Sequence, residues 1–203
     1  MIEQLFYKAA APAEGIIESS TLNLALDGID KSLQQHSLKQ VLLLPRSSLI
    51  EFELQAGQLK ENIVISDRFE LHNLDSGSVL QIGPAKIRLT FHCEPCSKIK
   101  HLVNPKKILH KRGYHGQIIQ AGRINIGDSI SLLNERYEPI PYDFADRIKW
   151  YLGKTSGDIW ASDLIYAIGL SSSYCRALPN ILRNRTDIDK SRILFKNKQG
   201  KTA

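Results

Sequence analysis

Residues 75–91 restrict the possible fold classes more than any other part of the sequence. Turn-forming residues at 75–78 and at 83–84 bracket the apolar run 79–82. In the stretch that follows, 85–91, apolar side chains alternate with Lys, Arg and Thr. A period of two residues is typical of a strand with one face in the core and one face in solvent. The sequence therefore predicts a β-hairpin over residues 79–91.

Further short apolar runs predict that the fold is mostly β. The other strand candidates are residues 14–18, 22–26, 39–44, 59–65 and 117–132. Short strands at irregular spacing, punctuated by glycine, favour a β-barrel over an α/β sheet. Apolar residues make up 42% of the chain, which is enough for a packed core. No apolar run approaches the ~20 residues of a membrane span, so no membrane association is expected.

The composition changes at Pro139-Ile140-Pro141, which predicts a stiff linker and a domain boundary. We expect a β domain over residues 1–138 and a small helical domain over residues 142–203. Within the second domain, apolar periodicity predicts helices at 142–152, 160–168 and 174–184. A helix, a turn containing Gly169 and another helix are typical of a helix-turn-helix.

The formal net charge of +6 is unevenly distributed. Residues 1–140 carry 16 Lys and Arg against 15 Asp and Glu, whereas residues 141–203 carry 11 against 6. A basic second domain favours an acidic partner, and DNA is the partner that we consider. The alternative is a solvated basic surface with no partner.

Cys93 and Cys96 lie three residues apart, directly after the predicted hairpin and with Pro95 between them. Residues 97–127 contain no Asp or Glu but seven Lys and Arg, which include Lys111 and Arg112. Nearby positive charge favours the thiolate form of a cysteine and suits a phosphate-bearing ligand. The sequence predicts a pocket for an anionic ligand around Cys96. A buried, inert thiol is the alternative.

The cysteines could also belong to a zinc site or to a thioredoxin-like redox motif. His92, Cys93, Cys96 and His101 contain the atom types of a zinc site, but adjacent ligands in a strand are strained and no second Cys-x-x-Cys exists. No βαβ pattern surrounds the pair, which disfavours a thioredoxin-like motif. Three cysteines and an N-terminus without a signal-peptide core favour a reducing, cytoplasmic setting.

The ordered set of motifs in the first domain resembles the MOSC family, named for the C-terminal domain of molybdenum cofactor sulfurases. The matching pieces are 39–43, Gly57, 60–63, Leu74, Gly77, Val79, 82–83, 89–90, 93–96, 116–118 and 122–130. The resemblance implies a β-barrel that binds a molybdenum–pterin cofactor. It also implies that Cys96, in the Pro-Cys position, binds molybdenum or carries sulfur.

The resemblance extends to cofactor and partner expectations. From the residues themselves, the cations Lys111, Arg112 and Arg123 and the loop end at His115 are the groups expected to hold the anionic pterin, and Cys93 is a further candidate that either shares the role of Cys96 or does not. The resemblance carries a family-level association with pyridoxal phosphate binding. Some relatives are oxidoreductases that act on N-hydroxylated compounds, so an enzyme of that kind or a sulfur carrier is expected. Either role implies a redox or sulfur-donor protein as a partner.

The second domain resembles the DNA-binding half of alkylguanine-DNA alkyltransferases and alkyltransferase-like proteins. The matching pieces are 141–148, 157–159, 167–170 and 174–178. Arg176 occupies the place of the arginine that enters the duplex, and Arg183, Arg185 and Arg192 would contact phosphates. The segment 190–194 contains neither Cys nor His where the transferase nucleophile would lie, so alkyl transfer is not expected.

Overall fold

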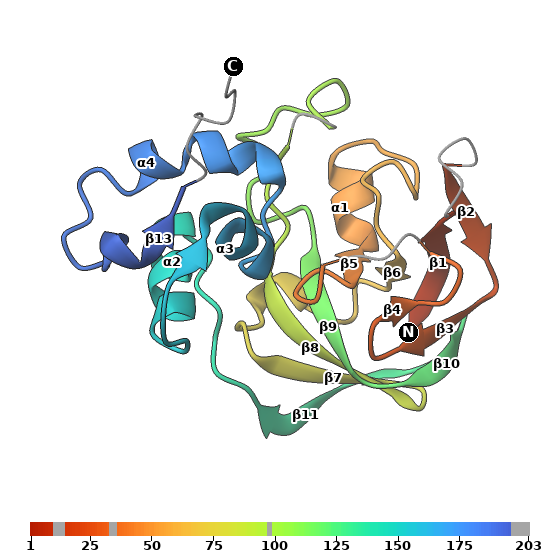
Figure 1. Cartoon of the computed structure of the whole chain (residues 1–203). Helices are drawn as coiled ribbons and strands as arrows, with labels where there is room; N and C mark the ends of the chain where they lie inside the picture. The colour runs from red at the N-terminus through yellow and green to blue at the C-terminus, as the bar shows by residue number, and fades with distance from the viewer. Residues whose placement is uncertain (10–14, 33–35, 97–98, 196–203) are drawn as a thin grey trace, which may run out of the picture. The chain divides into compact units, whose positions relative to one another are not determined.

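The protein is described as a computed structural model that covers residues 1–9, 15–32, 36–96 and 99–195 (Figure 1). The chain forms two compact units, Met1–Ile140 and Pro141–Ala203, and each is described by itself. Within the described residues, no helix has the length and apolar character needed to cross a membrane.

The first unit consists mainly of antiparallel strands. They are β1 (Ile2–Lys8), β2 (Ile16–Ser19), β3 (Thr21–Ala25), β4 (Gly28–Ile29), β5 (Val41–Pro45), β6 (Ile63–Ile65), β7 (Ser78–Ile82), β8 (Ala85–His92), β9 (Tyr114–Gln120), β10 (Gly122–Asn125) and β11 (Ile130–Arg136). Among the described residues of this unit, two short helical elements accompany the strands, α1 (Arg46–Glu51) and the 3-10 helix η2 (Leu71–Asn73).

The expected barrel is wrong, because the strands form open sheets. Over the described residues, the larger sheet has the order β11-β7-β8-β9-β5-β6-β1-β2, and a smaller one has the order β10-β3-β4. β11 and β2 form the two edges of the larger sheet and do not pair with each other. β10 leaves that sheet to pair with β3, which divides the strands into two sheets instead of one closed ring.

The predicted hairpin is confirmed. β7 and β8 pair antiparallel, with Val79 opposite Arg88 and Ile82 opposite Ala85. Gly83 in the turn has a φ of 52°, a left-handed conformation that favours glycine. Apolar residues of β8 are buried while Lys86 and Arg88 are half-buried, which reproduces the two-residue period of the sequence.

The larger sheet is covered on both faces. One core cluster joins it to the smaller sheet and includes Leu43, Leu24 and Ile124. On the other face, Leu44 belongs to a second cluster with residues from α1 and from the segment after the cysteine pair, such as Ile99. Successive side chains of β5 thus point into different cores, as the pleat of a strand requires. The loop that follows the cysteines is anchored by this second core.

The second unit contains short helices. They are α2 (Phe144–Leu152), α3 (Ala161–Ala167), the 3-10 helix η3 (Ser172–Arg176), α4 (Leu178–Ile181) and the 3-10 helix η4 (Lys190–Arg192), with the parallel strands β12 (Ile159–Trp160) and β13 (Ile193–Leu194). The Asp143 side chain caps α2 by accepting hydrogen bonds from the backbone N–H groups of Ala145 and Asp146. Gly169, with a φ of 78°, follows α3.

The continuous helix expected over residues 174–184 is wrong. The structure has η3 and α4 in its place. Pro179 explains the interruption, because proline lacks a backbone N–H and its ring clashes with the carbonyl four residues earlier in a helix. It fits within the first turn of α4, where an N–H would have no helical partner.

Arg147 of α2 is fully buried in the second unit. Its Nε, Nη1 and Nη2 donate hydrogen bonds to the carbonyl oxygens of Pro141, Ile168 and Tyr142, at 2.9, 3.1 and 2.8 Å. The guanidinium lies 5.6 Å from the centre of the Phe144 ring. One side chain therefore ties the start of the unit to the end of α3.

Candidate functional site

Cys96 lies in the irregular segment that follows β8, and its side chain is exposed. Arg112 Nη1 donates a hydrogen bond to Cys96 Sγ over 3.3 Å. A guanidinium in contact with sulfur stabilises the thiolate over the thiol. The predicted pairing of this thiol with a cation is therefore present in the geometry, and solvent can reach the sulfur.

Arg112 itself is only 5% exposed. It donates to the carbonyl oxygens of Glu94 and Leu59 as well as to the sulfur of Cys96. Its Nε is buried and has no hydrogen-bond partner among the described residues. A charge this far from water requires several acceptors, and this guanidinium uses one reactive side chain as an acceptor.

Gly113 explains why Arg112 is buried. Gly113 has a φ of 87°, and a Cβ at this position would lie 2.1 Å from the carbonyl oxygen of Leu43. Only glycine allows the backbone to approach β5 this closely. The carbonyl of Gly113 then accepts a hydrogen bond from the N–H of Cys93 at 2.9 Å. The chain thus passes close to β5 and to Cys93 at Gly113, and this places Arg112 next to the cysteine segment.

A second cation holds the same segment from another side. Lys39 Nζ forms an ion pair with Glu94 Oε2 at 3.2 Å, and both side chains are largely shielded from solvent. Lys39 also lies 5.2 Å from the ring centre of Phe91. The His115 ring packs edge-on against Phe91 at 5.6 Å. His115 is therefore connected to the cysteine segment through Phe91 and Lys39.

Cys93 has a different environment from Cys96. It is 4% exposed, and burial raises the pKa of its thiol to about 11. Its Sγ lies 3.9 Å from the carbonyl oxygen of Glu94. At neutral pH, Cys93 is protonated and shielded, so Cys96 is the thiol that reagents and ligands meet first.

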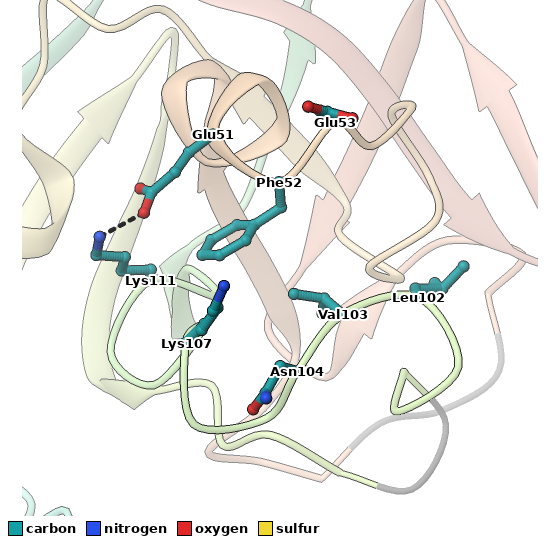
Figure 2. A pocket seen from close by; sticks show the side chains of 8 residues that line it. All are labelled: Glu51, Phe52, Glu53, Leu102, Val103, Asn104, Lys107 and Lys111. Atoms are coloured by element: carbon teal, nitrogen blue, oxygen red, sulfur yellow. Dashed lines mark hydrogen bonds and ion pairs between the residues drawn. The ribbon is translucent and has the colours of Figure 1, made fainter.

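Lys111 points into a neighbouring hollow. Its Nζ forms an ion pair with Glu51 Oε1 at 2.5 Å (Figure 2). A pocket of about 580 Å³ is lined by Glu51, Phe52, Glu53, Leu102, Val103, Asn104, Lys107 and Lys111. Figure 2 shows Lys111 to the left of the Phe52 ring and Lys107 below it. Cys96 does not line this pocket. Lys111 and Arg112 are adjacent in sequence, but Lys111 lines the pocket whereas Arg112 contacts Cys96.

Arg123 is not brought to the cysteine segment. It lies on β10, where its carbonyl oxygen is near Gly83 in the turn that precedes β8. Cys96 follows the opposite end of β8. The expected contribution of Arg123 to a site around Cys96 therefore does not fit the strand topology.

Three imidazoles form a stack that sequence reasoning missed. The His92 ring centre lies 6.0 Å from that of His72, 5.2 Å from that of His110 and 4.3 Å from that of Tyr114. Burial, followed by the charges of His110 and His72, lowers the pKa of His92 to about 4. The Nε2 of His72 accepts the N–H of Gly113 at 3.2 Å, so the stack supports the turn that positions Arg112.

A zinc site finds no support in the described part of the chain. Across its ranges 1–9, 15–32, 36–96 and 99–195, no three His, Cys, Asp or Glu side chains are placed to hold a metal ion. Cys93 is buried while Cys96 is exposed, so the two thiols face different surroundings.

The basic residues expected to contact DNA lie in the second unit. Arg176 is exposed at the end of η3. Arg183 donates to Asn180, and Arg185 donates to Asp146 and Asp187. Arg192 donates to the carbonyl oxygens of Leu152, Thr155 and Gly157. Three of the four guanidinium groups thus already bind acceptors of their own unit.

Comparison with protein families gives one match over half of the chain. The model of the MOSC domain matches residues 30–131, a range that contains β5 to β10, both cysteines of the site and Arg112. Comparison with curated proteins gives no match.

Solved structures share the fold at low sequence identity. YuaD from Bacillus subtilis has a TM-score of 0.56 at 14% identity, over 68% of this chain and 98% of that one. A hypothetical protein has a TM-score of 0.56 at 19% identity, over 95% of each chain. YiiM from Escherichia coli has a TM-score of 0.54 at 19% identity, over 96% of this chain and 98% of that one. The last two matches extend over both units.

Proposed function

The chain belongs to the MOSC domain family, and from this membership we propose that Cys96 is the residue through which the protein binds a molybdenum–pterin cofactor or carries a sulfur atom. The observation that carries the proposal is the 3.3 Å contact between the Arg112 guanidinium and an exposed Cys96 sulfur. Both roles require the thiolate, and both require that the sulfur be reachable.

The donor set around Cys96 fits a molybdenum–pterin. A thiolate is a soft ligand that suits such a metal, and the group would supply two-electron redox chemistry when bound. Arg112 would hold the thiolate in place, and its buried Nε supplies a donor without a partner among the described residues. The His115 ring contacts Phe91, which precedes the cysteine segment. Lys111 instead pairs with Glu51, and the Arg123 backbone lies near the turn before β8.

Elemental analysis of the purified protein tests metal binding. We expect molybdenum in the wild type, its loss in Cys96→Ala, and its retention in Cys175→Ala, a matched thiol variant in the other unit. Cys96→Ala that retains molybdenum at the wild-type level would show that this thiol is not the ligand.

Sulfur carriage predicts a different product at the same residue. Protein incubated with inorganic polysulfide would carry a persulfide on Cys96, because the thiolate attacks a polysulfide sulfur, a sulfur–sulfur bond of the polysulfide breaks and the shortened polysulfide leaves. The persulfide is seen as one added sulfur mass on the Cys96 peptide and is released by cyanide as thiocyanate. Cys93 and Cys175 peptides would remain unchanged, because both thiols are more shielded from solvent. Sulfur added equally to all three cysteines would argue against a dedicated carrier.

The proposed enzymatic role is reduction of N-hydroxylated compounds, with a redox protein as electron donor. Residues beside Cys96 would bind and orient the substrate next to the cofactor. Reduction of a hydroxylamine by the molybdenum-loaded protein, lost in Cys96→Ala, is the corresponding assay.

A second proposal concerns DNA binding by the second unit. The excess of basic residues over 141–203 favours it, and Arg176 is an exposed cation at a helix end. The internal hydrogen bonds of Arg183, Arg185 and Arg192 leave fewer cations for phosphates. We therefore expect weak binding with a shallow dependence on salt, because the slope scales with the number of phosphate contacts.

A further inference from the structure

The sulfur atoms of Cys93 and Cys96 are linked by shared contacts. Cys93 Sγ lies 3.9 Å from the carbonyl oxygen of Glu94. Arg112 Nη1 donates to that same oxygen and, at 3.3 Å, to Cys96 Sγ. One carbonyl and one guanidinium nitrogen thus lie between the two thiols, and both cysteines are in the reduced form.

The two thiols are unequal in a way that suits a sequential reaction. Cys96 is exposed and in contact with a cation, so an oxidant in solution meets this sulfur first. Cys93 is 4% exposed, and its high pKa keeps it protonated and unreactive toward reagents in solution. A nucleophilic cysteine with a shielded second cysteine nearby is the arrangement of an attacking and a resolving thiol.

The backbone between the two cysteines can bring them together without breaking the sheet. β8 ends at His92, and residues 93–96 are neither strand nor helix. The segment is held at its two ends, where the N–H of Cys93 donates to Gly113 and the carbonyl of Cys96 accepts from Ile99. A disulfide needs Cα atoms about 4.4–6.8 Å apart, so its formation requires residues 94 and 95 to adopt a turn.

We propose that Cys96 is a site of oxidation by hydroperoxides and that Cys93 resolves the oxidised form as an intramolecular disulfide. In the first step, the Cys96 thiolate attacks the outer oxygen of the hydroperoxide. A sulfur–oxygen bond forms, the oxygen–oxygen bond breaks, and the alkoxide or hydroxide that leaves takes a proton from water. The product is a sulfenic acid on Cys96.

In the second step, Cys93 sulfur attacks Cys96 sulfur. The sulfur–sulfur bond forms, the sulfur–oxygen bond breaks, and the hydroxyl group leaves with the Cys93 proton as water. Two thiols are oxidised and one hydroperoxide is reduced to an alcohol or water. The disulfide removes the thiolate from Arg112, and a dithiol reductant restores it.

The test treats the reduced full-length protein with an equimolar amount of hydrogen peroxide, then denatures and alkylates it for peptide mass spectrometry. In the wild type we expect a peptide with Cys93 joined to Cys96, an alkylated Cys175, and full recovery of both thiols with dithiothreitol. In Cys93→Ser we expect a sulfenic acid on Cys96 that dimedone traps. Without dimedone and with excess peroxide, that variant should progress to sulfinic and sulfonic acids, which dithiothreitol does not reverse.

Two controls keep the proposal falsifiable. Cys175→Ser should behave as the wild type, and Cys93→Ala, with its circular dichroism compared with that of Cys93→Ser, separates the lost thiol from a disturbed fold. The proposal is overturned if wild-type Cys96 becomes irreversibly oxidised as fast as in the Cys93 variants, with Cys93 still alkylated. This experiment needs no molybdenum, so its failure and a negative metal analysis are independent results.

Discussion

Each unit buries one arginine among the residues that the structure describes, and the two guanidinium groups differ in what they contact. Arg147 in the second unit donates to three backbone carbonyl oxygens and has no exposure. Arg112 in the first unit donates to two carbonyl oxygens and to the exposed sulfur of Cys96. Its Nε has no partner among the described residues.

The three hydrogen bonds of Arg147 named above go to backbone carbonyl groups, whereas Arg112 also contacts a side chain that can react. Burying a guanidinium is unfavourable unless its donors are satisfied, and Arg147 satisfies them with three backbone carbonyl groups. Arg112 has one nitrogen, Nε, without a partner among the described residues, and another, Nη1, in contact with a thiol. A buried charge that touches a reactive, accessible group is thus the better indicator of a functional site.

Arg147→Met should have the largest effect on stability. It leaves the carbonyl oxygens of Pro141, Tyr142 and Ile168 without this donor, and we expect a loss of about 3–4 kcal/mol. Both tryptophans, Trp150 and Trp160, belong to the second unit, so the urea midpoint of tryptophan fluorescence reports on that unit. Arg183→Met, an exposed control, should cost less than about 0.5 kcal/mol. Equal effects of the two variants would show that Arg147 is not the structural centre of the unit.

Arg112→Met should destabilise the first unit by a smaller amount. Two carbonyl oxygens lose a donor, but the unpartnered Nε is removed as well, so we expect a loss of about 1–2 kcal/mol. Hydrogen exchange of peptides from β5, β8 and β9 measures it, with Lys111→Met as a neighbouring, exposed control. A loss as large as that of Arg147→Met would erase the distinction between the two arginines.

The two units should also respond differently to acid. All six histidines belong to the first unit, and burial lowers the pKa of His92 and of His36 to about 4. Between pH ~6.5, the value in an unfolded chain, and pH ~4, the unfolded state binds protons that the folded state does not. Stability of the first unit should therefore fall as the pH decreases through this window.

Measurement of the urea midpoint across pH checks this expectation. His92→Phe retains a ring against Tyr114 and should weaken the pH dependence, whereas His101→Phe, at an exposed position, should leave it unchanged. The tryptophan signal of the second unit should be nearly constant over the same range. A first unit as insensitive to pH as the second would contradict the assignment of neutral, buried imidazoles.

The smallest effect is expected for DNA binding. Arg176→Ala should reduce the slope of log affinity against log salt by about one, the contribution of one phosphate contact. A duplex-shift assay across salt concentrations measures it, and Arg183→Ala serves as a comparison. No binding by the wild type at low salt would end the second proposal.

Local patterns in the sequence predicted local structure well. The hairpin of β7 and β8 followed from a two-residue period, and the helix expected over residues 142–152 is present as α2. The barrel failed because closure depends on which distant edges meet, and β10 pairs with β3 instead of closing the larger sheet. The break between η3 and α4 was available in the sequence as Pro179, a signal that apolar periodicity outweighed.

The residues of the candidate site show the same contrast between contacts that are local in sequence and contacts between distant segments. Proximity in sequence suggested Arg112, Lys111 and Arg123 as neighbours of Cys96. Arg112 contacts its sulfur, Lys111 pairs with Glu51, and the Arg123 backbone lies near the turn that precedes β8. The Lys39 ion pair and the stack of His72, His92 and His110 join residues far apart in the chain. Apart from His92, these residues lie outside strands, so their contacts depend on how the fold places its loops, which local sequence patterns do not specify.

The rate of Cys96 alkylation is the most direct test of the claim that Arg112 prepares this thiol. Iodoacetamide labelling of the native protein at neutral pH, resolved by peptide mass spectrometry, gives the rates of Cys96 and Cys175 in one sample. We predict that Arg112→Met slows the labelling of Cys96 severalfold, because the thiolate loses its contact with the guanidinium, and leaves the labelling of Cys175 unchanged. Equal rates at Cys96 in the wild type and in Arg112→Met would contradict the account.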